Sequence, residues 1–600
     1  MHELSPRKET EQKYHWHLED IFPSNDIWEQ TFADLEAKLP SFAAIKGTLG
    51  QSASTLKNNL EILDQASESL GKLYWYARMR ADEDATDSES QARSNRAQAL
   101  LVKYLAAIAF LEPELLTIPE ETIKEFTSQK PELQIYQHYF NNLWRQKEHI
   151  LNTNEEFIMA KAGQLIEAPH AIYNMLNNAD LKFPEITDAQ GNRVQLTHGR
   201  FIPLMQSQDR KVRQETFTAF YSTYDQVKHS TTALLSAQVN ANIFNGEVRK
   251  YKSAREAALA KNNISLAVYD SLIEAVNAKL PAMHQYVALR KKMLHLEELH
   301  MYDVYVPIVE EIKTTYSFED SKKIVKEALQ PLGAEYLNIL DQGMESGWCD
   351  VYENKGKRSG AYSCGVYGVH PYVLLNHQDT LDSLFTLAHE MGHAMHSYYT
   401  NKNQPYIYSD YSIFVAEVAS TVNESLLMNY LLHKVQNKKE RMFLLNHYLE
   451  EFKGTVFRQT MFAEFEKMIH EEVENGSALT VDYLNSVYKA LNEKYFGPEM
   501  MVDDLISLEW SRIPHFYLNF YVFQYATGFS SAVALAMGIL ENGSEALNRY
   551  LEFLKAGSSK YPIDILTQAG VDLSTPDPIV KALDVFEQIV AELSLLSLEN

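Results

Sequence analysis

The stretch LDSLFTLAHEMGHAMHSY, residues 381–398, is the most informative segment of this chain about its fold. Its apolar residues recur with the 3.6-residue period of a helix, at Leu384, Ala388, Met391, Met395 and Tyr398. Asp379 or Thr380 can cap the start of this helix. His389 and His393 lie off the apolar stripe and four positions apart, so both imidazoles can reach one ion. The pattern predicts a helix that packs by one face and presents two histidines on another.

Glu390 completes the arrangement H-E-x-x-H, which is typical of zinc sites. It follows His389 directly, so its carboxylate is rotated away from the imidazoles and yet close enough to act on a water at the ion. The alternative is a buried helix with two hydrogen-bonded histidines. The apolar stripe on the opposite face favours the metal site.

The third ligand is expected from the next predicted helix, Ser412 to Lys434, because a catalytic zinc has three protein ligands. Glu417 is embedded there among apolar residues, and an unpaired buried carboxylate costs several kcal/mol. Glu424 lies on the same face and is expected to orient a ligating histidine. The alternative is that Glu417 and Glu424 simply lie on a solvated polar face of this helix. We therefore predict one zinc ion per chain, bound by His389, His393 and Glu417.

Other segments in this chain accompany the motif. They are YHWHLEDIFP at 14–23, RSGAY at 358–362, PYVLLN at 371–376 and EVASTVNE at 417–424. With Glu417 twenty-four residues after His393, the chain resembles the thimet oligopeptidase family of zinc metallopeptidases, and within it the oligoendopeptidase F group, over nearly its whole length. The resemblance implies a mainly α, bowl- or clam-shaped molecule with a deep substrate channel. It also implies bound zinc and short peptides as substrates.

A tyrosine-rich segment, HFYLNFYVFQYATGF at 515–529, follows near the C-terminus. Its phenylalanines suit a core helix, whereas the phenols of Tyr517, Tyr521 and Tyr525 need partners if buried. The resemblance implies that a histidine and tyrosines here stabilise the oxyanion of peptide hydrolysis. It assigns His515, Tyr521 and Tyr525 to this work, and the role of each tyrosine stays open.

Three other histidines near the motif are given lesser roles. His396 is expected to contact a ligating side chain or the substrate rather than bind the metal. His370 and His377 are expected to be structural.

The rest of the chain predicts a mainly α-helical protein with an N-terminal helical domain, residues 1–185, and a catalytic domain, residues 186–600. The zinc-binding core is placed at about 355–430 and a C-terminal helical part at about 435–600. A hairpin is expected at Gly191-Asn192, and Met301 to Val306 is strand-like up to Pro307. Because strand signals gather just before the motif, we expect a small sheet beside its helix.

Composition narrows the class of protein. A formal net charge of −25 disfavours nucleic acid and anionic lipid as partners. Only two cysteines occur, the start of the chain is polar, and the apolar runs Leu100–Leu111 and Ser530–Leu540 are shorter than the about 20 residues of a membrane span. We expect a cytoplasmic protein that does not bind membranes. Its oligomeric state is open.

The sequence thus predicts a zinc-dependent endopeptidase that hydrolyses internal bonds of short oligopeptides, with Glu390 as general base. A substrate is expected to pair with the strand Tyr372 to Asn376. One alternative is a peptidyl-dipeptidase of the angiotensin-converting type, which carries the same motif. Another is a non-catalytic peptide-binding protein on the same scaffold, although the presence of Glu390 argues against it.

Overall fold

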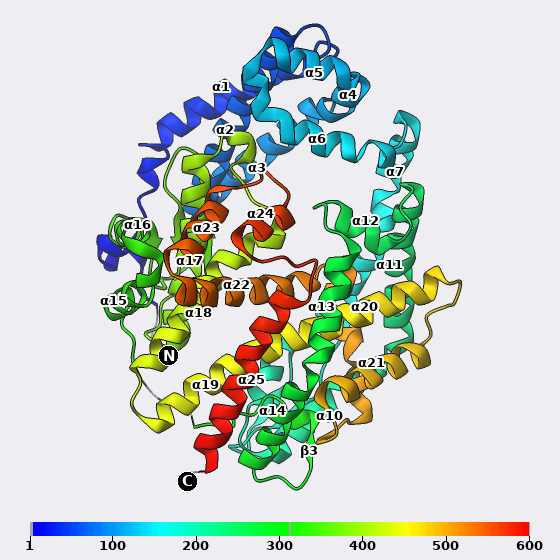
Figure 1. The fold of residues 1–600 in the computed structure, drawn as a ribbon, viewed down its shortest axis with the longest axis vertical. Coiled ribbons are helices and arrows are strands. Elements are labelled where there is room, and N and C mark those ends of the chain that lie inside the picture. The colour runs from blue at the N-terminus through cyan, green and yellow to red at the C-terminus, as the bar shows by residue number, and fades with distance from the viewer. Residues whose placement is uncertain (1–3, 311, 313, 599–600) are drawn as a thin grey trace. The chain divides into compact units, whose positions relative to one another are not determined.

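The computed structural model describes residues 4–310, 312 and 314–598, and most of them are helical (Figure 1). This confirms the mainly α prediction. The chain forms two compact units. The first contains Met1–Lys147, Thr314–Tyr430 and Leu535–Gly570, and the second contains Glu148–Lys313, Leu431–Ala534 and Val571–Asn600. The predicted domain boundary near residue 185, the bowl or clam shape and the channel stay predictions.

The first unit is built from helices before, around and after the motif. They are α1 (Asn25–Ala43), α2 (Ala53–Glu83), α3 (Ser88–Ile108), α4 (Leu111–Thr117), α5 (Glu120–Gln129), α6 (Gln137–Arg145), α15 (Phe318–Ala328), α16 (Gly333–Glu345), α17 (Leu381–Asn403), α18 (Ile413–Lys434), α23 (Ser544–Lys555) and α24 (Pro562–Ala569). Helix α17 carries the motif, and its cap is Thr380, whose hydroxyl accepts from the Ser383 amide at 3.1 Å. The predicted start of α17 and the predicted bounds of α18 are confirmed within a residue, and α17 continues to Asn403.

A three-stranded sheet packs against α17. Its strands are β4 (Cys349–Asp350), β5 (Tyr362–Cys364) and β6 (Tyr372–Leu374), in the order β4-β6-β5. The predicted sheet beside the motif helix is confirmed. The predicted pairing of substrate with Tyr372 to Asn376 is wrong, because β6 is the central strand and both its edges are already paired. Among the described strands of this sheet, the outer strands β4 and β5 each have one edge without a strand partner.

The second unit is also helical. Its helices are α7 (Thr153–Ile166), α8 (Ala168–Met175), α9 (His198–Met205), α10 (Arg210–Asp225), α11 (Lys228–Val248), α12 (Ala254–Ala260), α13 (Leu266–Ala278), α14 (Leu280–Met293), α19 (Lys438–Phe452), α20 (Arg458–Glu474), α21 (Val481–Phe496) and α25 (Asp577–Leu598). Strands β1 (Glu185–Thr187) and β2 (Arg193–Gln195) form the expected antiparallel hairpin. Strands β3 (Leu299–His300) and β7 (Met500–Met501) pair in parallel.

The prediction of a strand at Met301 to Val306 is wrong. Only Leu299–His300 is a strand, and a 3-10 helix, Met301–Asp303, follows it. The backbone carbonyls that would bind a neighbouring strand instead accept hydrogen bonds from buried, positively charged side chains. Arg290 donates to the Val306 carbonyl at 2.7 Å, and Lys453 donates to the Val304 carbonyl at 3.0 Å.

Helix α22 (Phe523–Asn542) passes from the second unit into the first and contains the apolar run Ser530–Leu540. With its 20 residues it is longer than the run alone suggests, and by length and composition it could cross a membrane. However, 67% of its apolar window is buried inside the structure, and core helices of soluble proteins pass the same test. This helix is therefore weak evidence for a membrane span.

Candidate metal centre

A close crossing of α17 and α18 builds the site. A Cβ placed on Gly392 would lie 2.5 Å from the Ser420 Cα, so only glycine permits this approach. Asn423 of α18 fixes the crossing, because its amide donates to the Ala388 carbonyl of α17 at 3.1 Å. Its side-chain oxygen accepts from the Tyr336 hydroxyl at 3.0 Å. The crossing brings Glu417 beside the two motif histidines.

The three predicted ligand atoms form a nearly equilateral triangle. The Nε2 atoms of His389 and His393 are 3.2 Å apart, and each lies 3.3 Å from Glu417 Oε2. Tetrahedral zinc with bonds of about 2.0–2.1 Å separates neighbouring ligand atoms by roughly 3.3–3.4 Å. The residues therefore fit a zinc ion. Within residues 4–310, 312 and 314–598, this is the one cluster of at least three histidine, cysteine or acidic side chains with converging ligand atoms.

Carboxylates around the triangle set the state of His389. Its Nδ1 lies 3.2 Å from Glu424 Oε1, which leaves Nε2 facing the other two ligands. Burial lowers the pKa of His389, but contacts with Glu417 and Glu424 raise it well above its usual value. The Glu417 side chain is 47% exposed, so it is less buried than its apolar neighbours in the sequence suggest. The burial that remains opposes its ionisation, but hydrogen bonds from His389 and His393 hold its pKa well below its usual range. The site thus keeps a carboxylate charged among groups that a cation can bind.

Glu390 lies on the buried side of the same helical turn and is 7% exposed. Burial raises the pKa of its carboxyl group, and the neighbouring His389 and His393 act in the opposite direction. A carboxyl group with a raised pKa can both accept and return a proton near neutral pH. It is not one of the three converging ligands.

The structure separates the remaining histidines near the motif from the triangle. His396 is 1% exposed and stacks on Tyr411 with ring centroids 3.7 Å apart, and burial lowers its pKa to about 3. His370 stacks on Trp348 at 5.4 Å, and His377 Nε2 lies 3.0 Å from the Tyr316 carbonyl oxygen. None of the three contributes to the converging ligand atoms.

The tyrosine-rich segment belongs to the second unit. A 3-10 helix, Pro514–Tyr517, holds His515, and its Nε2 lies 3.4 Å from the Tyr525 hydroxyl. The Tyr521 ring centroid lies 6.2 Å from that of His515 and 5.4 Å from that of Tyr525. Tyr517 points elsewhere and stacks on Tyr173 at 4.3 Å. His515, Tyr521 and Tyr525 therefore lie close together. Because the proposed metal ligands belong to the other unit, the catalytic role of these three residues stays a proposal.

Sequence reasoning missed a cavity of about 310 Å³ in the first unit, beside the end of β5. Ser363, Gly365 and Tyr411 line one side of it, and Lys72 and Trp75 of α2 line another. These segments are some 300 positions apart in the chain, so no local pattern could reveal the cavity. It is a candidate subsite for a peptide that pairs with β5.

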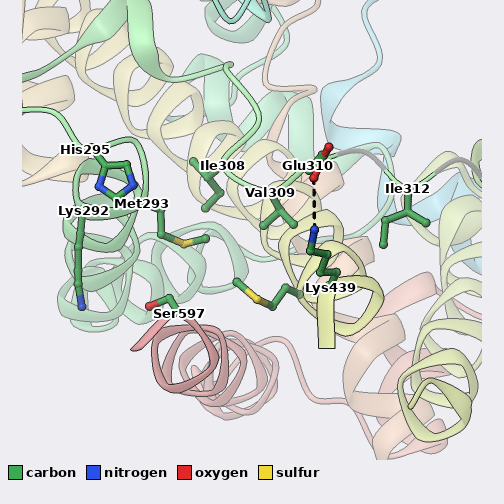
Figure 2. A pocket seen from close by; sticks show the side chains of 10 residues that line it. Lys292, Met293, His295, Ile308, Val309, Glu310, Ile312, Lys439 and Ser597 are labelled. Atoms are coloured by element: carbon green, nitrogen blue, oxygen red, sulfur yellow. Dashed lines mark ion pairs between the residues drawn. The ribbon is translucent and has the colours of Figure 1, made fainter. Parts of the chain in front are cut away.

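A larger cavity, about 470 Å³, lies in the second unit (Figure 2). Apolar side chains such as Met293, Ile308 and Val309 line it, and an ion pair joins Glu310 and Lys439 at 3.7 Å across its wall. Its lining residues contain no cluster of metal ligands. We assign no role in catalysis to this cavity.

The sequence also matches the models of known protein families. Residues 203–585 match the model of peptidase family M3, and residues 114–183 match that of oligopeptidase F. The chain belongs to peptidase family M3. It is 48% identical to oligopeptidase PepF of Bacillus subtilis, over 99% of this chain and 89% of that protein. It is 43% identical to the group B oligopeptidase PepB of Streptococcus agalactiae, over 98% of both chains.

Solved structures extend the likeness to the fold. The oligoendopeptidase F of Enterococcus faecium has a TM-score of 0.75 and 40% identity, over 95% of this chain and 99% of that one. A solved structure from Chlamydophila abortus has a TM-score of 0.94 and 37% identity, over 99% of this chain and 100% of that one. As a member of family M3, the protein is a metalloendopeptidase.

Proposed function

We propose that this M3 peptidase is a zinc-dependent endopeptidase that cleaves internal bonds of short oligopeptides in the cytoplasm. The observation that carries the proposal is the triangle of His389, His393 and Glu417, whose sides match tetrahedral zinc. The names of its relatives, oligopeptidase and oligoendopeptidase, support short peptides as substrates. The two cysteines, Cys349 and Cys364, are free and buried, which suits a reducing compartment.

The residues of the first unit divide the work. His389, His393 and Glu417 hold the ion, and Glu424 keeps His389 oriented toward it. A bound zinc ion supplies Lewis-acid chemistry, since it lowers the pKa of water and polarises a carbonyl. Glu390 takes the proton of the attacking water and delivers it to the leaving amine.

Hydrogen-bond donors complete the proposed chemistry. As the water attacks, the carbonyl oxygen of the scissile bond becomes an oxyanion, and hydrogen-bond donors aimed at it stabilise the transition state by several kcal/mol. We assign this role to His515, Tyr521 and Tyr525, which lie together in the structure. The substrate backbone pairs with the unpaired edge of β5.

A set of peptides of increasing length tests the substrate class. We expect internal cleavage of the short peptides and no cleavage of a folded globular protein, read by mass spectrometry, with intact casein as an unfolded control. C-terminally amidated copies should be cut equally well. Release of C-terminal dipeptides alone would identify a peptidyl-dipeptidase instead. Rapid cleavage of the folded protein at many sites would contradict the proposed restriction to short peptides.

A further inference from the structure

The segment between His515 and Tyr521 contains a strained turn. Asn519 and Phe520 both have positive φ angles, 50° and 58°. Asparagine tolerates this left-handed region, but phenylalanine rarely enters it. Such strain persists only where the surrounding structure holds it. The turn separates two of the proposed oxyanion donors, so its shape sets where they lie relative to each other.

One side chain holds the backbone of this turn. Glu466 of α20 accepts a hydrogen bond from the Phe520 amide at 2.7 Å. Glu466 is completely buried, and its second oxygen, Oε2, has no hydrogen-bond partner among the described residues. An apolar side chain would fill this position at a lower cost than a carboxyl group with one donor. The carboxyl group is therefore best explained by its contact with the turn.

The same face of α20 also holds the Phe520 ring. The ring centroid of His470 lies 4.5 Å from that of Phe520, and the ring centroid of Tyr269 in α13 lies 5.8 Å from it. Nδ1 of His470 lies 2.8 Å from the Glu466 carbonyl, and its Nε2 lies 3.2 Å from the Asn242 amide nitrogen. Both the amide and the ring of Phe520 are thus fixed by residues one helical turn apart.

Of Glu466 and the two titratable residues that pack around it, His470 and Tyr269, Glu466 is the one whose charge changes just above neutral pH. Burial raises the pKa of Glu466 itself to about 8. It lowers the pKa of His470 to about 4 and raises that of Tyr269 well above its usual value. At pH 7 the neutral carboxyl group accepts from Phe520 without a buried charge.

We propose that Glu466 is a positioning residue, which stabilises the strained turn Asn519-Phe520 and thereby places His515 and Tyr521 for peptide hydrolysis. This proposal rests on the proposed function of those two donors. Glu466 itself does not touch the substrate. It acts through the backbone of the turn.

The test compares Glu466→Leu, Glu466→Gln and Glu472→Leu in the full-length, zinc-loaded protein. Glu472 is a half-buried residue on the same helix and serves as the control. We expect Glu466→Leu to lower kcat about tenfold or more with unchanged zinc content and a smaller change in KM. Its peptides covering 515–525 should exchange amide hydrogen faster. Glu466→Gln keeps an acceptor for Phe520 and should retain most of the turnover, and Glu472→Leu should match the unaltered protein.

A rescue separates positioning from general stability. Adding Asn519→Gly to Glu466→Leu relieves part of the strain, because glycine adopts positive φ freely, and should restore part of kcat. If Glu466→Leu does not fold, Asn519→Val tests the same turn from its half-buried side and should lower kcat at full zinc content.

The pH dependence of stability gives a readout free of activity. An acid whose folded pKa lies above its unfolded value costs stability as pH rises toward that folded pKa. The Tm of Glu466→Gln minus that of the unaltered protein should therefore increase between pH 6 and pH 9. A difference in Tm that does not change with pH would contradict a buried neutral carboxyl group.

Two outcomes separate this inference from the proposed function. Folded Glu466→Leu with unchanged kcat and unchanged exchange at 515–525 would overturn the positioning role alone. A zinc-loaded, unaltered protein that cleaves no peptide would overturn the proposed function, and the exchange data would still test whether Glu466 holds the turn.

Discussion

Glu390→Gln is expected to keep its zinc and to lose peptide turnover by about 10²–10⁴-fold or more. Glutamine preserves the size of the side chain and removes its basicity. The structure supports this separation, because Glu390 is buried beside the triangle without being one of its three ligands. The loss can exceed the usual range, since one carboxyl group serves both proton transfers.

The measurement is kcat together with zinc content per chain, at matched free zinc. The control is Glu472→Gln, a similar change far along the chain in α20. A Glu390→Gln protein that turns over peptides at the unaltered rate would exclude Glu390 as the general base. Loss of zinc in this variant would instead make it a ligand.

Glu417→Gln is expected to weaken zinc binding, with part of the turnover restored by added zinc. A neutral amide oxygen at this position still faces His389 and His393 but no longer brings a negative charge to the ion. Glu424→Gln is the matched comparison, because Glu424 contacts Nδ1 of His389, the ring nitrogen that faces away from the other two proposed ligands. Residues that orient a ligand typically contribute about 10–100-fold to metal affinity or activity.

Titrating zinc into the metal-free forms of both variants checks this order. The affinity of Glu417→Gln should fall further than that of Glu424→Gln. The reverse order would move the third ligand to Glu424.

The cluster of proposed metal ligands could be predicted from the sequence because it depends on short-range geometry. His389 and His393 share a helical face through their spacing alone, and Glu417 stands out as a carboxylate among apolar residues. The need for glycine at position 392 is visible only in the structure, where the backbone of Ser420 approaches it closely.

Long-range pairing explains what the sequence could not provide. The stretch Tyr372 to Leu375 is apolar. Its central position follows from pairing with β5 on one side and, on the other, from the carbonyls of Trp348 and Asp350, which accept from Val373 and Leu375 at 2.8 Å. Likewise, Met301 to Val306 has the composition of a strand. Its carbonyls bind Arg290 and the distant Lys453 instead.

Glu466 shows a signal that sequence reasoning passed over. It lies four residues after Phe462 and four before His470, on a face of α20 that is otherwise buried. A carboxyl group on an apolar helical face needs a hydrogen-bond donor or a cation as its partner, and the same reasoning applies to Glu417. The partner here is a backbone amide fifty-four residues away, which composition and periodicity do not reveal.

Metal analysis of protein purified without added metal, beside a His389→Ala/His393→Ala double variant, tests the zinc site most directly. Two of the three corners of the triangle are removed in the variant, while the apolar face of α17 that packs into the core is left intact. The account predicts about one zinc per chain in the unaltered protein and none in the double variant, with both folded to the same extent by circular dichroism. Stoichiometric zinc that survives in the double variant would contradict it.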